Sequence, residues 1–225
     1  MSAMRSPGLR AARQTLAIAC LAGAFLLAAP AQALEELRGE EAAIKACDKR
    51  LCAILVRKET KGEDLRCNLT KTWARSSIKQ AESHKLSWGY GDARCTAEIN
   101  LSRAQVVGAL TGDKRKLRVP PHTVNCVVEQ EGKLEKVTAT VAPKIEFRDG
   151  KAEKIWINLK EVDGPAAIRA TVVTAAELAD KLGLFHRRMI KQINRYIERR
   201  CPENHPELAA ASARGPAAQS KPQKK

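Results

Sequence analysis

The even number of cysteines beyond residue 33 constrains this fold more than any other feature of the sequence. These cysteines are Cys47, Cys52, Cys67, Cys95, Cys126 and Cys201. In an exported chain such a set predicts three disulfides. Cys47 and Cys52 lie on one predicted helix, roughly 140° apart around its axis, so each needs a distant partner. A Cys95–Cys126 bond is conceivable, and Cys201 could tie the last helix to the first. The pairing otherwise stays open.

The remaining cysteine, Cys20, falls in an N-terminal segment with the order of a secretory signal peptide. Residues 1–33 contain three arginines and no acidic residue, followed by an uncharged run over 15–29 and a small-residue triplet that ends at Ala33. That run is shorter than the roughly 20 apolar residues of a bilayer-spanning helix. Lipid attachment at Cys20 is disfavoured because it would leave an apolar stretch on the mature side. We therefore predict cleavage after Ala33, a periplasmic or secreted location and no transmembrane anchor.

The charge of the chain points to an anionic partner. Lys and Arg number 40 against 25 Asp and Glu, which gives a formal charge of +15, and the excess persists without the signal segment. The length predicts a single α+β domain over residues 34–205. Over residues 206–225 apolar periodicity is lost and basic residues dominate, which predicts a disordered basic tail.

Helical periodicity marks the two ends of the domain. Apolar residues recur every three or four positions over 35–58, less regularly over 70–85, and again over 184–200, which predicts three helices. Thr174 and Glu177 have the spacing of a capping box, so a further helix is expected to begin there.

The centre of the chain has a period of two, which is typical of half-buried strands. Apolar and polar residues alternate over 95–101, 124–128 and 137–147. Asp149 and Gly150 then supply a tight hairpin turn before an answering strand at 155–159.

Two local features interrupt these strands. Ser102 and Gln105 form a capping box for a short helix that ends near Gly112, and Pro143 predicts a bulge or an edge position, and hence a bent strand. The resulting order of elements predicts an α+β fold in which helices pack on one face of a curved antiparallel sheet, stapled by disulfides.

Catalytic signals are weak. The chain has no C-x-x-C, G-x-S-x-G or Walker-type motif, and its four histidines are scattered at His84, His122, His186 and His205. Neither a metal site nor a cofactor is therefore predicted, and no catalytic residue can be singled out. The sequence favours a non-catalytic protein. An envelope enzyme with a site of dispersed residues near the Trp88–Tyr90 loop stays an alternative.

Aromatic and basic residues supply the candidate binding positions. Trp88 and Tyr90 lie between glycines in a loop, and Trp156 has the opposite parity to its apolar neighbours. Each aromatic residue either covers the core or marks a contact patch. The last helix carries several basic residues and a single acid, Glu198. The basic residues form either a solvated face or a site for anions. These basic residues are Arg187, Arg188, Lys191, Arg195, Arg199 and Arg200.

These features lead to the hypothesis of an exported binding protein that meets an anionic envelope component or an acidic protein through its basic C-terminal helix and tail. Phosphate and carboxylate oxygens suit the arginine fork. Peripheral contact with a membrane surface fits this hypothesis, whereas nucleic acid is not expected in that compartment. A periplasmic inhibitor or assembly factor is a second alternative.

Overall fold

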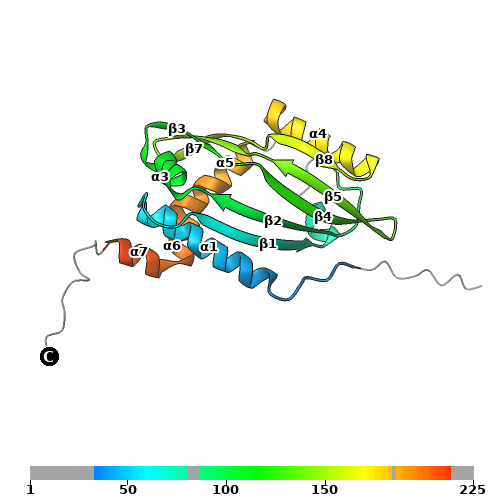
Figure 1. Ribbon diagram of the computed structural model, residues 1–225, viewed down its shortest axis with the longest axis horizontal. Coiled ribbons are helices and arrows are strands. Elements are labelled where there is room, and N and C mark those ends of the chain that lie inside the picture. The colour runs from blue at the N-terminus through cyan, green and yellow to red at the C-terminus, as the bar shows by residue number, and fades with distance from the viewer. Residues whose placement is uncertain (1–32, 81–86, 184–185, 214–225) are drawn as a thin grey trace, which may run out of the picture. The chain divides into compact units, whose positions relative to one another are not determined.

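The strands of this protein form two antiparallel sheets (Figure 1). The computed structural model describes residues 33–80, 87–183 and 186–213. The five-stranded sheet has the order β1-β2-β4-β5-β8, and the three-stranded sheet has the order β3-β6-β7. The strands are β1 (Leu65–Trp73), β2 (Ala93–Leu101), β3 (Lys114–Arg118), β4 (His122–Gln130), β5 (Lys133–Val141), β6 (Lys144–Arg148), β7 (Lys151–Trp156) and β8 (Leu159–Asp163).

The helices lie before, between and after the strands. They are α1 (Glu40–Arg57), α2 (Arg75–Gln80), α3 (Arg103–Thr111), α4 (Ala166–Leu182), α5 (His186–Arg195), the π-helix η1 (Tyr196–Arg200), α6 (Cys201–Asn204) and α7 (Pro206–Ala213). In the part of the chain that the structure describes, no helix has the length and apolar character needed to cross a bilayer.

The helices cover one face of the five-stranded sheet, as predicted. Cys67 and Ile99 are opposite each other in register and pack against α1 and α3. Val128 and Val137 lie on the same face and pack against Ile168 of α4. Figure 1 shows α1 running beside β1 and α4 beside β8. The α+β class is therefore confirmed, with a core on one side of the sheet.

The long predicted strand over 137–147 is two strands in different sheets. β5 ends before Ala142 and Pro143, and β6 begins after them, because proline has no N–H to donate to a ladder. The returning strand also divides, at Ile157 and Asn158. The carboxylate of Asp180 accepts hydrogen bonds from both of these backbone N–H groups, at 2.6 and 2.7 Å. The two breaks lie together because the Asn158 side chain donates to the carbonyl of Ala142.

Two predicted helices need correction. The region 70–85 is not one helix. Strand β1 runs to Trp73, α2 covers Arg75–Gln80, and residues 81–86 lie outside the described residues. The alternation of apolar Leu65, Cys67 and Leu69 with polar Arg66, Asn68 and Thr70 was the better signal. β1 pairs along its whole length with β2.

The capping box at Thr174 does not begin a helix. α4 begins at Ala166, directly after Pro165, and Thr174 lies exposed in its middle. Ile168 is 1% exposed, so tertiary packing fixes the first turn of this helix more strongly than a local capping signal can. The helix ends at Gly183 in the left-handed conformation that favours glycine.

The segment expected to begin a disordered tail at residue 206 is helical. α7 spans Pro206–Ala213, and Leu208 is buried in the core beside α1. Glu207 adds an ion pair of 3.0 Å with Lys49. The segment is rich in alanine and has one large apolar residue, Leu208, so its sequence shows no apolar periodicity that would predict a packed helix. Residues 214–225 lie outside the described part.

Three disulfides connect these layers. Cys47 bonds Cys67, Cys52 bonds Cys201, and Cys95 bonds Cys126. The predictions that Cys47 and Cys52 have distant partners, that Cys95 meets Cys126, and that Cys201 ties the last helix to the first are confirmed. Three disulfides are typical of proteins that fold outside the reducing cytosol, in agreement with an extracellular or secreted location.

Candidate anion-binding surface

The outer face of the three-stranded sheet carries most of the basic side chains of that sheet. Residues that face each other in register share one face of a sheet. Leu117, Ile145 and Ile155 form such a row on the inner face, where all three are buried or half-buried. By the same register, the outer face presents Lys114, Lys116 and Arg118 of β3, Lys144 and Arg148 of β6, and Lys151 and Lys154 of β7.

Several of these cations lie directly opposite one another. Lys114 faces Arg148, and Arg148 faces Lys151, so that one row across the sheet is entirely basic. Arg118 faces Lys144 in a second row. Like charges at opposed positions of an antiparallel pair are destabilising by a fraction of a kcal/mol up to about 1 kcal/mol. The fold therefore retains a concentration of charge that its own stability disfavours.

Two carboxylates partly balance this charge. Glu146 accepts from the Lys116 ammonium at 3.1 Å, and Glu153 accepts from Arg148 at 2.8 Å. The hydrogen bond from Lys116 lowers the pKa of Glu146 below its ordinary value, more than partial burial raises it. Glu146 is therefore ionised near neutral pH, and the cations of this face outnumber the two acids.

Helix α5 lies along the free edge of β7. The side chain of Asn194 both accepts from the N–H of Ala152, at 2.8 Å, and donates to its carbonyl, at 3.0 Å. Further along, Glu198 pairs with Lys151 at 3.4 Å. Asn194 takes the place that a fourth strand would occupy, and it fixes the rotation of the helix relative to the sheet.

That rotation places two cations of α5 beside the sheet. Arg187 and Lys191 precede Asn194 by seven and three positions, so they lie on the helix stripe that contacts β7. Both are exposed, and neither pairs with a carboxylate of the described residues. Arg188 and Arg195 are also exposed but lie about a quarter turn further from the sheet. We call the cations of the outer sheet face, together with Arg187 and Lys191, the basic surface.

Trp156 belongs to the same surface. The Lys144 ammonium lies 3.8 Å from the centre of the Trp156 ring, and the His186 ring at the start of α5 lies 6.1 Å away, edge to face. The indole is half-buried. The structure thus brings together Trp156 and the basic residues of the last helix, which lie about thirty residues apart in the chain. Arg199, in contrast, lies on η1 and pairs with Glu203.

The chain matches no family model, no curated protein and no solved structure.

Trp88 and Tyr90 lie elsewhere, against the buried cluster of Ala93, Val128, Val137 and Ile168. Their rings pack edge to face at 5.0 Å beside Ile168 of α4. The Trp88 indole N–H donates to the Gly91 carbonyl at 2.7 Å, and the Tyr90 hydroxyl lies 2.9 Å from the Thr171 hydroxyl. Both rings are half-buried. They cover the core, and the structure does not bring them to the basic surface.

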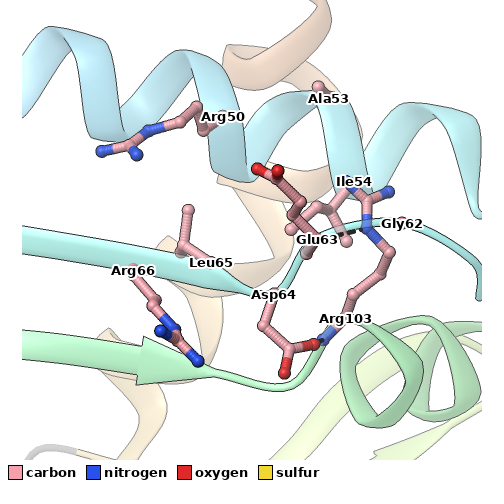
Figure 2. Close-up of a pocket in the computed structure, with 9 residues that line it drawn as sticks. All are labelled: Arg50, Ala53, Ile54, Gly62, Glu63, Asp64, Leu65, Arg66 and Arg103. Carbon is pink, nitrogen blue, oxygen red and sulfur yellow. Dashed lines mark hydrogen bonds between the residues drawn. The ribbon is translucent and has the colours of Figure 1, made fainter.

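A pocket of about 600 Å³ opens between α1 and the segment that precedes β1 (Figure 2). It is lined by Arg50, Arg66 and Arg103, with Glu63 and Asp64 among them. Figure 2 shows that the three guanidinium groups point in different directions. The Arg103 guanidinium donates to the backbone carbonyl of Glu63, and the backbone N–H of Arg103 donates to the Asp64 carboxylate. These hydrogen bonds hold the loop before β1 against α3. Because acidic and basic side chains are mixed in the lining, the pocket is not a focused anion-binding site.

A polar cluster joins the C-terminal segment to α1. The Asp48 carboxylate accepts from the Tyr196 hydroxyl at 2.7 Å and contacts the His205 ring at 2.9 Å. Burial raises the pKa of Tyr196 well above its usual range, and the hydrogen bond to Asp48 adds to the effect. The hydroxyl therefore stays protonated. Among the described residues no group of three His, Cys, Asp or Glu side chains is arranged to hold a metal ion.

Sequence reasoning missed the largest part of the basic surface. The residues from Lys114 to Arg118 are four cations and one buried apolar residue, Leu117. The run Lys-Arg-Lys-Leu-Arg has no apolar–polar alternation, so the sequence did not identify it as a strand. The partners of those cations come from β6 and β7, and only the pairing of the three strands assembles them.

Proposed function

We propose that this is an exported, non-catalytic binding protein whose basic surface holds the anionic headgroups of an envelope membrane. The single observation that carries the proposal is an excess of opposed cations. Arg148 and Lys151 have carboxylate partners, but the facing cations Lys114, Arg118 and Lys144 have none among the described residues. Opposed cations cost stability in the free protein. The cost is offset when an anion bridges the cations, because charge-assisted hydrogen bonds to phosphate are among the stronger polar contacts.

Protection of the sheet edge does not account for this surface. Lysines on an edge strand prevent pairing with other chains, which explains cations on β3. Lys144 and Arg148, however, lie on β6, the central strand. The edge of β7 is already covered by α5 through Asn194.

The shape of the basic surface favours an array of anions over one small ion. Its cations extend over three strands and the adjoining helix stripe, with neighbouring strands about 4.8 Å apart. The side chains lie side by side on a sheet and do not converge on one enclosed position. Phosphates in a headgroup layer present repeated charges of this kind, and Trp156 adds the ring type enriched at membrane interfaces.

The test is binding to sedimented vesicles of phosphatidylglycerol and phosphatidylcholine, with pure phosphatidylcholine as the uncharged comparison. The variant Lys114→Gln, Arg118→Gln, Lys154→Gln removes three cations that have no ion pair among the described residues. Each is worth about 1 kcal/mol at an anionic membrane, so binding should fall roughly 100-fold. Added salt should weaken wild-type binding as well.

A matched control distinguishes loss of the basic surface from a general loss of positive charge. The variant Lys133→Gln, Lys136→Gln, Lys160→Gln removes three exposed cations from β5 and β8 of the five-stranded sheet. It should bind almost as the wild type does. Equal loss in both variants, or retention in the first, would overturn the proposal. Capture of one acidic protein with no vesicle binding would favour the inhibitor or assembly factor instead.

A further inference from the structure

An apolar cavity of about 390 Å³ lies behind the three-stranded sheet, on the face opposite to the basic surface. Its buried walls are Leu55 of α1, Val106 and Leu110 of α3, Leu117 of β3 and Phe147 of β6. Protein interiors have few voids larger than a water molecule. A space of this size, lined by side chains from seven elements, is within the range of small-molecule sites.

The π-helix η1 forms a further wall of the cavity. Tyr196, Ile197 and Arg200 of η1 all line the cavity. π-helical turns are rare and are frequently found at functional sites. This turn is held in place at both ends, by the hydrogen bond from Tyr196 to Asp48 and by the disulfide that joins Cys201 to α1. The wall is therefore preorganised and does not depend on a ligand for its shape.

Polar groups occur only at the mouth of this cavity, among its described lining residues. Gln192 and Arg200 are both exposed, and the other lining side chains are apolar or, in Tyr196, bonded elsewhere through the hydroxyl. A dry site of about 150 Å³ lined by Leu, Ile and Phe admits benzene. On that scale the present cavity has room for roughly 15 carbon atoms. The lining selects an apolar body, and the arginine selects a negative end.

We propose that this cavity binds a single acyl chain that ends in an anionic group, with the chain inside and the charged group at Arg200. The chemistry is shared by a free fatty acid and a single-chain phospholipid. The inference does not depend on the function proposed for the basic surface. The sheet cations of that surface lie on the opposite face of the three-stranded sheet, and the two sites share no residue.

The experiment is calorimetric titration of the full mature chain with dodecanoate below its micelle concentration, and with dodecanol as the uncharged comparison. Dodecanoate should bind more tightly than dodecanol. Arg200→Gln should weaken dodecanoate about tenfold or more, as expected for loss of a charged hydrogen-bond partner, and leave dodecanol unchanged. Arg199→Gln is the matched control, because Arg199 is adjacent on η1, exposed and outside the cavity lining.

A second variant fills the cavity. Ile197→Trp replaces a half-buried lining residue and should abolish binding of both dodecyl probes while circular dichroism shows a folded protein. The Lys114, Arg118 and Lys154 variant should bind dodecanoate as the wild type does. A titration with lysophosphatidylglycerol identifies the source, since tighter binding than dodecanoate assigns a lipid headgroup and weaker binding assigns a free acid. Absence of binding by both anions, or equal binding of dodecanoate to the wild type and Arg200→Gln, would overturn the inference.

Discussion

The two sheets of this protein share one design but differ in the charge of their solvent faces. Each has an apolar face against helices and a polar face outward. In the five-stranded sheet, opposed outward residues form hydrogen bonds with each other. The hydroxyls of Thr70 and Thr96 lie 3.0 Å apart, and the Thr138 hydroxyl donates to the side-chain carbonyl of Asn125. In the three-stranded sheet Lys114 faces Arg148. In the described strands, like-charge pairs occur in the smaller sheet alone.

Under the proposed function, the face of the larger sheet supports the fold and the face of the smaller sheet binds a partner. Polar neighbours such as Thr70 and Thr96 contribute to stability without attracting ions. Opposed cations weaken the pairing of their own strands, and the proposed anion would offset that cost. The smaller sheet can tolerate this cost because it buries apolar side chains such as Phe147 and Ala152 on its inner face.

The largest effect is expected from the disulfide behind the smaller sheet. Cys52 and Cys201 are completely buried and close a loop of 149 residues. Replacing both with alanine should lower the free energy of unfolding by about 5 kcal/mol. Replacing Cys95 and Cys126, which join already paired strands 31 residues apart, should cost less, about 4 kcal/mol at most. Urea unfolding measures both, and the reverse order would contradict the view that the smaller sheet depends on the C-terminal segment.

An intermediate effect is expected from acid, which should loosen the five-stranded sheet first. Burial alone would raise the pKa of Glu40, but hydrogen bonds from the Thr72 hydroxyl and from the N–H groups of Leu37 and Thr72 lower it below 4.5. A carboxylate with a lowered folded pKa stabilises the fold above its unfolded pKa, and this contribution is lost as pH falls through the folded value. The loss is expected below pH 4.5.

Hydrogen exchange measures this loosening strand by strand. Below pH 4.5, β1 should exchange faster relative to β7 than it does at neutral pH. Glu40→Gln should destabilise the protein at neutral pH by about 1–3 kcal/mol and remove part of the acid sensitivity of β1. Uniform acceleration in both sheets would show that Glu40 does not act locally.

The smallest effect is expected from substitutions that remove opposed cations from the smaller sheet or introduce them into the larger sheet. Lys114→Thr and Arg118→Thr remove opposed cations from the smaller sheet and should each stabilise it by about 0.5 kcal/mol. Thr70→Lys with Thr96→Lys creates an opposed pair in the larger sheet and should cost about 1 kcal/mol. Thermal and urea unfolding at low salt would detect both changes. If the cation removals destabilise the protein, the basic face has a structural role.

The comparison also shows how far the sequence could predict the site. Arg187 and Lys191 were recognised because a single helix carries its charges at regular spacing, and Trp156 because its parity differed from that of Ile155. Their proximity was not predictable, since the hydrogen bonds between Asn194 and the backbone of Ala152 decide it. The cavity was equally hidden, because its walls come from seven elements, which include α1, α3 and η1.

The sequence by itself determined the features that depend on near neighbours. These are the alternation of β2 and β4, the turn at Asp149 and Gly150, and the impossibility of a Cys47–Cys52 bond. Tertiary structure alone decided where the chain leaves one sheet for the other, at Pro143 and Asn158, and how the C-terminal segment docks through Leu208. Local patterns record which face of an element is apolar. Which elements meet depends on packing between residues far apart in the chain, and no local pattern contains that information.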